Sequence, residues 1–208
     1  MDPAQSLRIS SKMLLLFSIV CITNTCKKNA SDYNTLPPIT QEGKGTLGFK
    51  VNGVVWVPHN PCSAVVLSPP ACELEYQIEP LQRNSYGNVP ILFSLLATRI
   101  DNNTETEFQV LQEYGVYFSK EGNVADSLNI SYGLNDNTNS GSSFSLNYGP
   151  GVSNLFQVTK IDTIRHFISG IFQFNLVEKN NGVVVATLAI TDGRFDLPFG
   201  SKCTCSHN

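Results

Sequence analysis

The dipeptide Asn52-Gly53 constrains the fold of this chain more than any other feature. It stands between two runs of β-favouring residues, 46–51 and 54–57. A two-residue hairpin turn of this kind needs positive φ at both central residues, which Asn and Gly adopt readily. The sequence therefore predicts a β-hairpin over residues 46 to 57.

The rest of the chain continues in short β-favouring runs separated by Gly, Pro and Asn. In residues 172–178 apolar and polar side chains largely alternate, as a strand with one buried face requires. Only 90–98 and 106–114 also allow a helix. A chain of 208 residues is by default one domain. We therefore expect an all-β fold, a single antiparallel β-sandwich or flattened barrel. Beyond the first hairpin, the predicted strands are 64–67, 72–78, 91–100, 108–118, 128–132, 144–148, 155–161, 167–178, 183–190 and 193–199.

The N-terminal end has the features of an export signal. Arg8 and Lys12 precede an apolar run at 13–22. A positive end followed by a short hydrophobic core is typical of a signal peptide. Ten residues also fall short of the roughly 20 that a membrane-spanning helix needs. We therefore expect this segment to be removed after export.

The residues that follow resemble a bacterial lipoprotein signal, in which a cysteine becomes the acylated first residue of the mature protein. The resemblance implies a lipid on Cys26. Three residues before the cysteine the family pattern has Leu, Ala or Val, and this chain has Thr23. Immediately before the cysteine the pattern has Gly, Ala or Ser, and this chain has Thr25. Cys21 is the alternative lipidation site, and an ordinary secretory signal is the alternative to lipidation.

The stretch after this cysteine has the composition of a linker. Residues 27–40 are polar, contain Pro37-Pro38 and lack periodicity. The sequence therefore predicts three parts: a lipoprotein signal peptide at 1–25, a lipidated cysteine with its linker at 26–44, and an all-β domain at 45–208.

Five segments resemble a family of uncharacterised envelope lipoproteins from Bacteroidota-type bacteria. The resemblance implies an envelope lipoprotein with a β-rich domain, placed at the outer membrane and facing either the periplasm or the cell exterior. It implies no known activity. The segments are 36–41, 48–58, 168–174, 181–182 and 190–197.

Four cysteines remain outside the signal region, an even number that suits an oxidising compartment. Cys62 and Cys72 flank a Pro-rich loop, while Cys203 and Cys205 lie near the C-terminal end. A bridge within Cys-x-Cys would be strained, so we expect each C-terminal cysteine to pair with one of the earlier two. The alternative is a four-thiolate zinc site, with His59 or His207 added, but the spacing lacks paired Cys-x-x-Cys hooks.

Composition and motifs argue against several activities. The net charge is -3, and no cluster of Lys and Arg beyond the N-terminal segment could neutralise phosphates, which excludes nucleic acid as a partner. None of the three histidines lies in a catalytic or metal-binding motif. We expect no metal and no cofactor. Paired acids at Glu73 and Glu75, or at Glu105 and Glu107, allow a glycoside hydrolase.

Two further features suggest ligands. Residues 135–143 alternate oxygen donors as a calcium loop does, but they hold one carboxylate and no closing acid, so a flexible polar loop is the preferred interpretation. Trp56 and the seven tyrosines could stack on sugar rings, although a Trp at the end of a hairpin strand is more commonly a core residue.

These observations lead to three functional hypotheses. The first is a membrane-anchored envelope lipoprotein whose β domain is non-enzymatic and binds a glycan, a peptide or another envelope protein, or is structural. The second is a glycan-directed hydrolase that uses Glu73 and Glu75. The third is a carrier that encloses a small apolar ligand, as closed barrels do.

Overall fold

The computed structural model describes residues 33–59, 74–80, 91–101, 104–112, 122–123, 128–135 and 141–204, and most of them lie in β-strands. The all-β prediction is confirmed. The strands are β1 (Thr46–Val51), β2 (Val54–Trp56), β3 (Leu74–Pro80), β4 (Ile91–Asp101), β5 (Thr104–Gln112), β6 (Gly122–Asn123), β7 (Leu128–Asn135), β8 (Ser142–Leu146), β9 (Leu155–Asp162), β10 (Phe167–Asn180), β11 (Val183–Pro198) and β12 (Gly200–Thr204).

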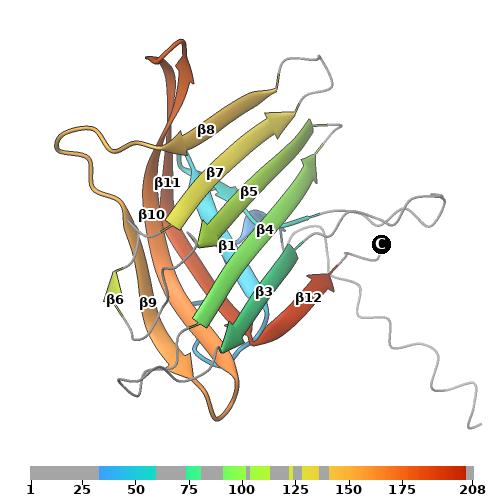
Figure 1. Cartoon of the computed structure of the whole chain (residues 1–208). Coiled ribbons are helices and arrows are strands. Elements are labelled where there is room, and N and C mark those ends of the chain that lie inside the picture. Colours follow the sequence, from blue (N-terminus) through green and yellow to red (C-terminus); the bar gives the residue numbers. More distant parts are fainter. Residues whose placement is uncertain are drawn as a thin grey trace, which may run out of the picture.

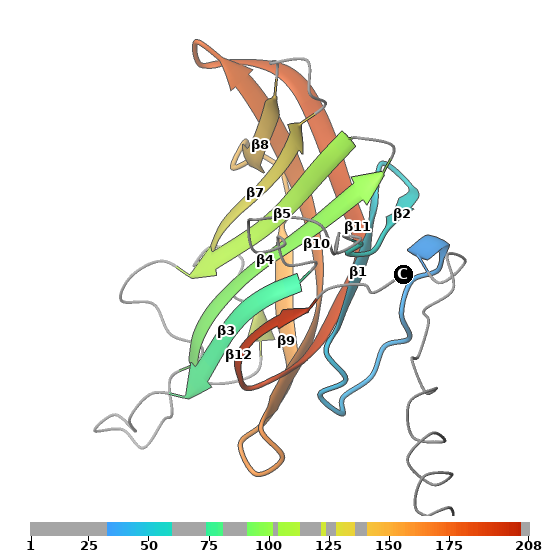
Figure 2. The same ribbon diagram turned by 90° about the vertical axis from the view of Figure 1, so that its right-hand side faces the viewer.

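All the strands belong to one antiparallel sheet that curls around its own core (Figures 1 and 2). The strand order is β12-β3-β4-β5-β7-β8-β10-β11-β1-β2. The sheet branches at β10, because β8 pairs with its residues 176 and 177 while β9 pairs with residues 167 to 173 on the same side. The result is an open barrel in which β10 and β11 are the longest strands.

One short contact links the two arms of the curl. His59, three residues after β2, forms an isolated bridge with Arg99 in β4. Its N–H donates to Thr98 O at 3.0 Å, and its carbonyl accepts from Ile100 N–H at 2.7 Å. The Arg99 guanidinium also donates to Val55 O at 3.1 Å. The end of the first hairpin is therefore fastened to a strand on the far arm of the sheet.

Aromatic rings fill the interior of the curl. Phe49 of β1 lies 4.6 Å from Phe108 of β5, and Phe108 stacks on Phe172 of β10 at 5.4 Å between centroids. Phe156 of β9 packs on Phe195 of β11 at 5.1 Å. All five rings are at most 3% exposed. These contacts between distant strands show that the interior of the curled sheet is a packed core. A carrier would need this space for its ligand.

Asn52-Gly53 and Asn181-Gly182 both have the positive φ angles that a two-residue hairpin turn needs. The φ angles are 48° at Asn52 and 84° at Gly53, and 50° at Asn181 and 80° at Gly182. These left-handed angles match the twist of the flanking strands, which favours tight hairpins. The prediction of a hairpin over residues 46 to 57 is confirmed.

The strand predicted at 91–100 is confirmed as β4, and the strand predicted from residue 108 overlaps β5, so the helix alternative for 90–98 and 106–114 does not hold where the structure describes them. Two local features differ from the predictions. The two strands predicted at 183–190 and 193–199 are one strand, β11, with a bulge at 191–192 that includes Asp192 at φ 53°. Strand β12, which pairs with β3, was not predicted.

The described part of the predicted linker packs on the domain. We call residues 33–45 the strap. Pro37 lies so close to Gly48 that a Cβ at that glycine would come within 2.5 Å of its ring. The carbonyl of Pro37 accepts from Arg194 Nη1 at 3.3 Å, and Tyr33 is only 7% exposed. The strap is therefore part of the folded body, which begins before residue 45.

Candidate functional site

A trough of about 600 Å³ lies across the outer face of β10 and β11. Its floor includes Gln173 and Asn175 from β10 and Thr187 and Ala189 from β11. Asn175 pairs directly with Ala189 across the two strands. Because side chains alternate along a strand, these residues point outward while Phe172, Phe174 and Leu176 fill the core. The site thus rests on the most extensively paired part of the sheet.

Asn52 forms one wall of the trough. Its left-handed turn places its backbone N–H against Ala189 O at 2.9 Å, and its Oδ1 accepts from Ala189 N–H at 2.9 Å. Pairing of β1 with β11 ends at Val51. The side chain of Asn52 therefore takes the place of the next backbone hydrogen-bond partner of β11. The backbone and the side-chain oxygen of Asn52 are therefore fixed relative to the floor.

The loop that joins β8 to β9 forms the other wall, and asparagines fasten it to β10. Asn154 Oδ1 accepts from Asn175 N–H at 2.9 Å, and Asn154 Nδ2 donates to Asn147 O at 2.9 Å. Asn175 Nδ2 donates to Ser153 O at 3.1 Å. These bonds fill the gap in the ladder between the β8 and β9 pairings, where the polar groups of β10 would otherwise lack partners.

The lining of the trough is uncharged and combines polar side chains with apolar ones from Val152, Leu176, Leu188 and Ala189. None of the described residues that line it is charged, and the polar ones are amides and hydroxyls. Tyr148, which follows the lining residue Asn147 in the chain, is 65% exposed. Amides both donate and accept hydrogen bonds, whereas they are poor acids and bases near neutral pH. The lining can therefore orient a neutral ligand that is rich in hydrogen-bonding groups.

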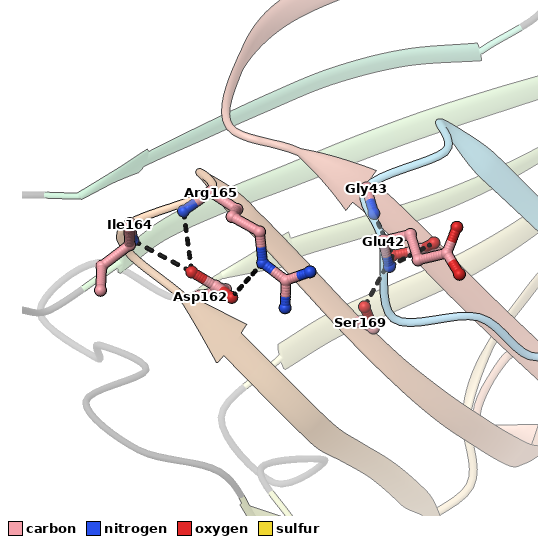
Figure 3. Close-up of polar contacts among 7 residues, drawn as sticks. Glu42, Gly43, Asp162, Ile164, Arg165 and Ser169 are labelled. Carbon is pink, nitrogen blue, oxygen red and sulfur yellow. Dashed lines mark hydrogen bonds and ion pairs between the residues drawn. The ribbon is translucent and has the colours of Figure 1, made fainter.

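A second polar centre lies where the strap meets the sheet. The Asp196 carboxylate of β11 is 2% exposed. It accepts hydrogen bonds from Thr40 Oγ1 at 2.6 Å, from Ser169 Oγ at 2.7 Å and from Gly43 N–H at 2.8 Å. The backbone N–H groups of Glu42 and Lys44 donate to it at 3.1 and 3.2 Å. Figure 3 places Glu42 and Gly43 of the strap beside Ser169 of β10. We call this arrangement the clasp.

The hydrogen bonds of the clasp determine the charge state of Asp196. Burial alone would raise the pKa of this carboxyl group, but the bonds from Thr40, Ser169, Gly43 and Glu42 outweigh it and hold the pKa below its ordinary value. The carboxylate is therefore ionised at neutral pH. With all five donors directed at it, its role is to hold the strap, and it is not available to a ligand.

Trp56 belongs to the core. The residue is 4% exposed, and its ring stacks on Phe49 at 4.5 Å. Its Nε1–H donates to Thr106 Oγ1 at 2.9 Å. The indole is therefore not a surface platform for a sugar ring.

Most of the predicted cysteine sites lie outside the described residues. These include Cys21 and Cys26 of the signal region, the disulfide candidates Cys62, Cys72 and Cys205, and His207. Cys203 lies in β12, where it pairs opposite Glu75 of β3. The C-terminal strand therefore runs beside the strand that begins two residues after Cys72, which is compatible with the expected bridges but leaves them a prediction.

The candidate acids and metal ligands are dispersed where the structure describes them. Glu75 is exposed on the outer face of β3, Glu107 is exposed on β5, and Glu73 lies outside the described residues, as does most of the suspected calcium loop. Among the described residues, no three His, Cys, Asp or Glu side chains are grouped so that they could hold a metal ion. The described part of the chain contains no helix long and apolar enough to cross a membrane.

Histidine 166 is a turn residue. It lies in the β9–β10 turn at φ 60°. The turn is stabilised by Asp162, whose carboxylate accepts from the backbone N–H groups of Ile164 at 3.1 Å and Arg165 at 2.8 Å (Figure 3).

Sequence reasoning missed both polar centres. The trough depends on asparagines that are distant in the sequence, and such residues are read locally as turn formers. The sequence did contain a signal for Asp196, which stands between Phe195 and Leu197 in a β pattern. A carboxyl group in such a position is buried only when it has hydrogen-bond partners. No family model, curated protein or solved structure matches the chain.

Proposed function

We propose that this chain is a membrane-anchored envelope lipoprotein whose β domain binds a neutral glycan in the trough without transforming it. The observation that carries the proposal is the lining, in which uncharged amides and hydroxyls converge from β10, β11, the Asn52 turn and the 147–153 loop. Sugars present hydroxyl groups that both donate and accept hydrogen bonds, so amides are suitable partners for them.

The rigidity of the walls supports binding by preformed geometry. Asn52 is fixed to β11, and the loop is fixed to β10 by Asn154 and Asn175. Polar groups that are already held in place lose little entropy when a ligand arrives.

The binding half of the proposal is tested with glycans that differ in charge. The purified protein is screened against neutral and acidic polysaccharides, and hits are measured by calorimetry. We expect neutral polymers to bind and Gln173→Ala to weaken binding about threefold to tenfold, which corresponds to one lost hydrogen bond of about 1 kcal/mol.

Asn129→Ala is the matched control, because Asn129 is an exposed amide on the outer face of β7. It should leave the affinity unchanged. Absence of binding to every neutral glycan, or equal losses in Gln173→Ala and Asn129→Ala, would refute binding in the trough. Turnover of a bound polymer would instead favour the hydrolase hypothesis.

The anchoring half is tested by metabolic labelling with a clickable fatty acid and by intact mass of the membrane-extracted protein. We expect the label to be lost in Cys26→Ala and retained in Cys21→Ala, with the mature chain beginning at residue 26. A chain that keeps its first 25 residues and carries no label would contradict the anchor while leaving the glycan proposal standing.

A further inference from the structure

The chain contains two Asn-Gly dipeptides, Asn52-Gly53 and Asn181-Gly182, and each forms the turn of a hairpin. Asparagine is thermolabile, and it deamidates most readily before glycine, which has no side chain to hinder attack by its backbone nitrogen. At Gly53 and Gly182 no atom beyond the chain neighbours lies within 4 Å of the position that a Cβ would occupy. Each dipeptide is therefore a candidate site of spontaneous modification.

The two turns have nearly the same backbone. The φ angles are 48° and 84° at Asn52-Gly53, and 50° and 80° at Asn181-Gly182. Both asparagines are exposed. Because conformation and exposure match, a difference in reactivity must come from the contacts of the asparagine side chains and from the strands that support the turns.

The side chain of Asn52 is held in place, whereas that of Asn181 is not. Asn52 Oδ1 accepts from Ala189 N–H at 2.9 Å, and Asn52 N–H donates to Ala189 O at 2.9 Å. Within the described part of the chain, the side chain of Asn181 forms no hydrogen bond. Deamidation requires the side-chain carbonyl carbon to turn toward the next backbone nitrogen. At Asn52 the bond from Ala189 must therefore break first.

The supporting strands differ in the same direction. Beside the Asn52 turn, Val51 of β1 pairs with Ile190 of β11. At the end of the β10–β11 hairpin, the two strands pair only with each other among the described residues, because β8 reaches β10 only at residues 176 and 177. Figures 1 and 2 show this hairpin projecting beyond its neighbours. A hairpin end without flanking strands opens locally more readily than the body of a sheet.

We propose that Asn181-Gly182 is the site at which the folded chain deamidates, and that the hydrogen bond from Ala189 protects Asn52-Gly53 from the same reaction. The Gly182 nitrogen forms a bond to Asn181 Cγ, the Cγ–Nδ2 bond breaks, and the Gly182 amide proton leaves with ammonia. Water then opens the cyclic imide. Cleavage of the new bond gives aspartate, and cleavage of the original backbone C–N bond gives isoaspartate. Nothing is oxidised or reduced.

The protected asparagine is the one that forms a wall of the trough. Reaction at Asn52 would put a negative charge into a lining whose described residues are all uncharged. An isoaspartate would also lengthen the backbone of the turn by one carbon and move it relative to Ala189. Asn181 does not line the trough, so its reaction leaves the lining unchanged. The fold therefore directs the modification away from the trough.

The test compares the two sites within one protein. The full chain, purified from the fraction in which it accumulates, is incubated at mildly alkaline pH, once folded and once unfolded in guanidinium chloride. Peptide mapping by mass spectrometry follows the replacement of ammonia by water at each site. We expect the ratio of the Asn181 rate to the Asn52 rate to be at least about fivefold higher in the folded chain, the factor given by one hydrogen bond of about 1 kcal/mol. The unfolded ratio corrects for the different preceding residues, Val51 and Asn180.

Ala189→Pro tests whether the bond to Asn52 is the cause. Proline removes the N–H donor, and this N–H points to Asn52 and not to β10, so the β10–β11 ladder keeps its hydrogen bonds. We expect the Asn52 rate in the folded variant to rise about fivefold. Thr187→Pro is the matched control, because Thr187 lies two residues away in the same pairing register with β10. It should leave both rates unchanged.

Three results would overturn the proposal: the same ratio of rates in the folded and the unfolded chain, faster reaction at Asn52 than at Asn181 in the folded chain, or no reaction at Asn181 while the chain is folded. Equal Asn52 rates in folded Ala189→Pro and Thr187→Pro would also contradict it. Circular dichroism shows whether each variant is folded, and if Ala189→Pro is not, the ratio in the native chain decides. No glycan enters the experiment, so its outcome is independent of the proposed function.

Discussion

Asparagine at position 196 would test whether the clasp holds the strap. In the native chain Oδ1 accepts from Glu42, Gly43 and Ser169, and Oδ2 accepts from Thr40, Glu42 and Lys44. Asparagine keeps one side-chain oxygen, but an amide NH2 group replaces the other. This hydrogen-bond donor then faces the N–H and O–H donors of the clasp. The hydroxyls of Thr40 and Ser169 can rotate to accept from the new amide, whereas backbone N–H groups cannot.

The magnitude follows from this count. A hydrogen bond to a charged group contributes about 1.5 to 3 kcal/mol, but the strap is partly exposed and its freed N–H groups can reach water. We therefore expect Asp196→Asn to lower the free energy of unfolding by about 2 to 3 kcal/mol, which corresponds to a fall in Tm of about 5 to 10 °C. Asp196→Ala removes both oxygens and should cost about 3 to 5 kcal/mol.

The pH dependence provides an independent check. Because the pKa of Asp196 is lowered in the folded chain, the folded state binds this proton less tightly than the unfolded state, whose Asp titrates near ~3.9. The stabilisation is fully present above the unfolded pKa and is lost as pH falls through the lower folded pKa. The difference between native chain and variant should therefore be constant at neutral pH and shrink in acid.

Urea unfolding from pH 7 into the acid range measures both effects, and hydrogen exchange of the Glu42–Lys44 amides reports on the strap directly. Asp192→Asn is the control, since Asp192 lies on the same strand but forms an exposed ion pair with Lys50 at 2.8 Å. Exposed pairs contribute at most about 1 kcal/mol. A loss for Asp196→Asn no larger than for Asp192→Asn, or one that persists undiminished in acid, would refute the clasp.

Three further changes test the core and the covalent framework. Gly193→Ala should destabilise the fold by about 1 to 3 kcal/mol in urea unfolding, because the new Cβ would lie 2.3 Å from the buried ring of Phe172; stability within 0.5 kcal/mol of native, roughly the scatter of neutral substitutions, would contradict this. Trp56→Phe should cost about 1 to 2 kcal/mol through its lost bond to Thr106 and leave glycan affinity unchanged, whereas a large loss of affinity would restore the indole as a ligand platform. The intact mass should fall by the mass of two hydrogens for each disulfide that the cysteines of the β domain form under oxidising conditions; these are Cys62, Cys72, Cys203 and Cys205. An unchanged mass would favour free thiols.

The sequence predicts the elements of this fold better than their assembly. Asn52-Gly53 and the alternation after Phe172 specify hairpins from local chemistry alone. The branch at β10 does not follow from local pattern, because it depends on where β8 stops pairing and β9 begins. Strand β12 contains Gly, Ser, Lys, Cys and Thr, a composition with little β preference, and pairing with β3 determines its conformation.

The trough illustrates the same limit at the level of a site. Gln173 occupies an outward position that alternation predicts, but nothing local indicates that Asn52 and Asn147 stand on either side of it. Those two residues come together only because β1 and β8 flank β10 and β11 in the sheet order. A site built from neutral amides also lacks the charge or metal-ligand spacing that makes catalytic motifs recognisable.

The segments on which the expected resemblance to envelope lipoproteins was based lie together in the fold. Pro37 packs on Gly48, Thr40 and Ser169 donate to Asp196, and Arg194 donates to the Pro37 carbonyl, so segments 36–41, 48–58, 168–174 and 190–197 meet at the strap. They fasten the strap to the sheet, and two of them also supply Asn52 and Gln173 to the trough. By contrast, the 147–153 wall of the trough lies outside all of them. We therefore expect replacement of residues 147–153 to change glycan preference and to leave the clasp intact, whereas an unchanged preference would argue against the trough as the glycan site.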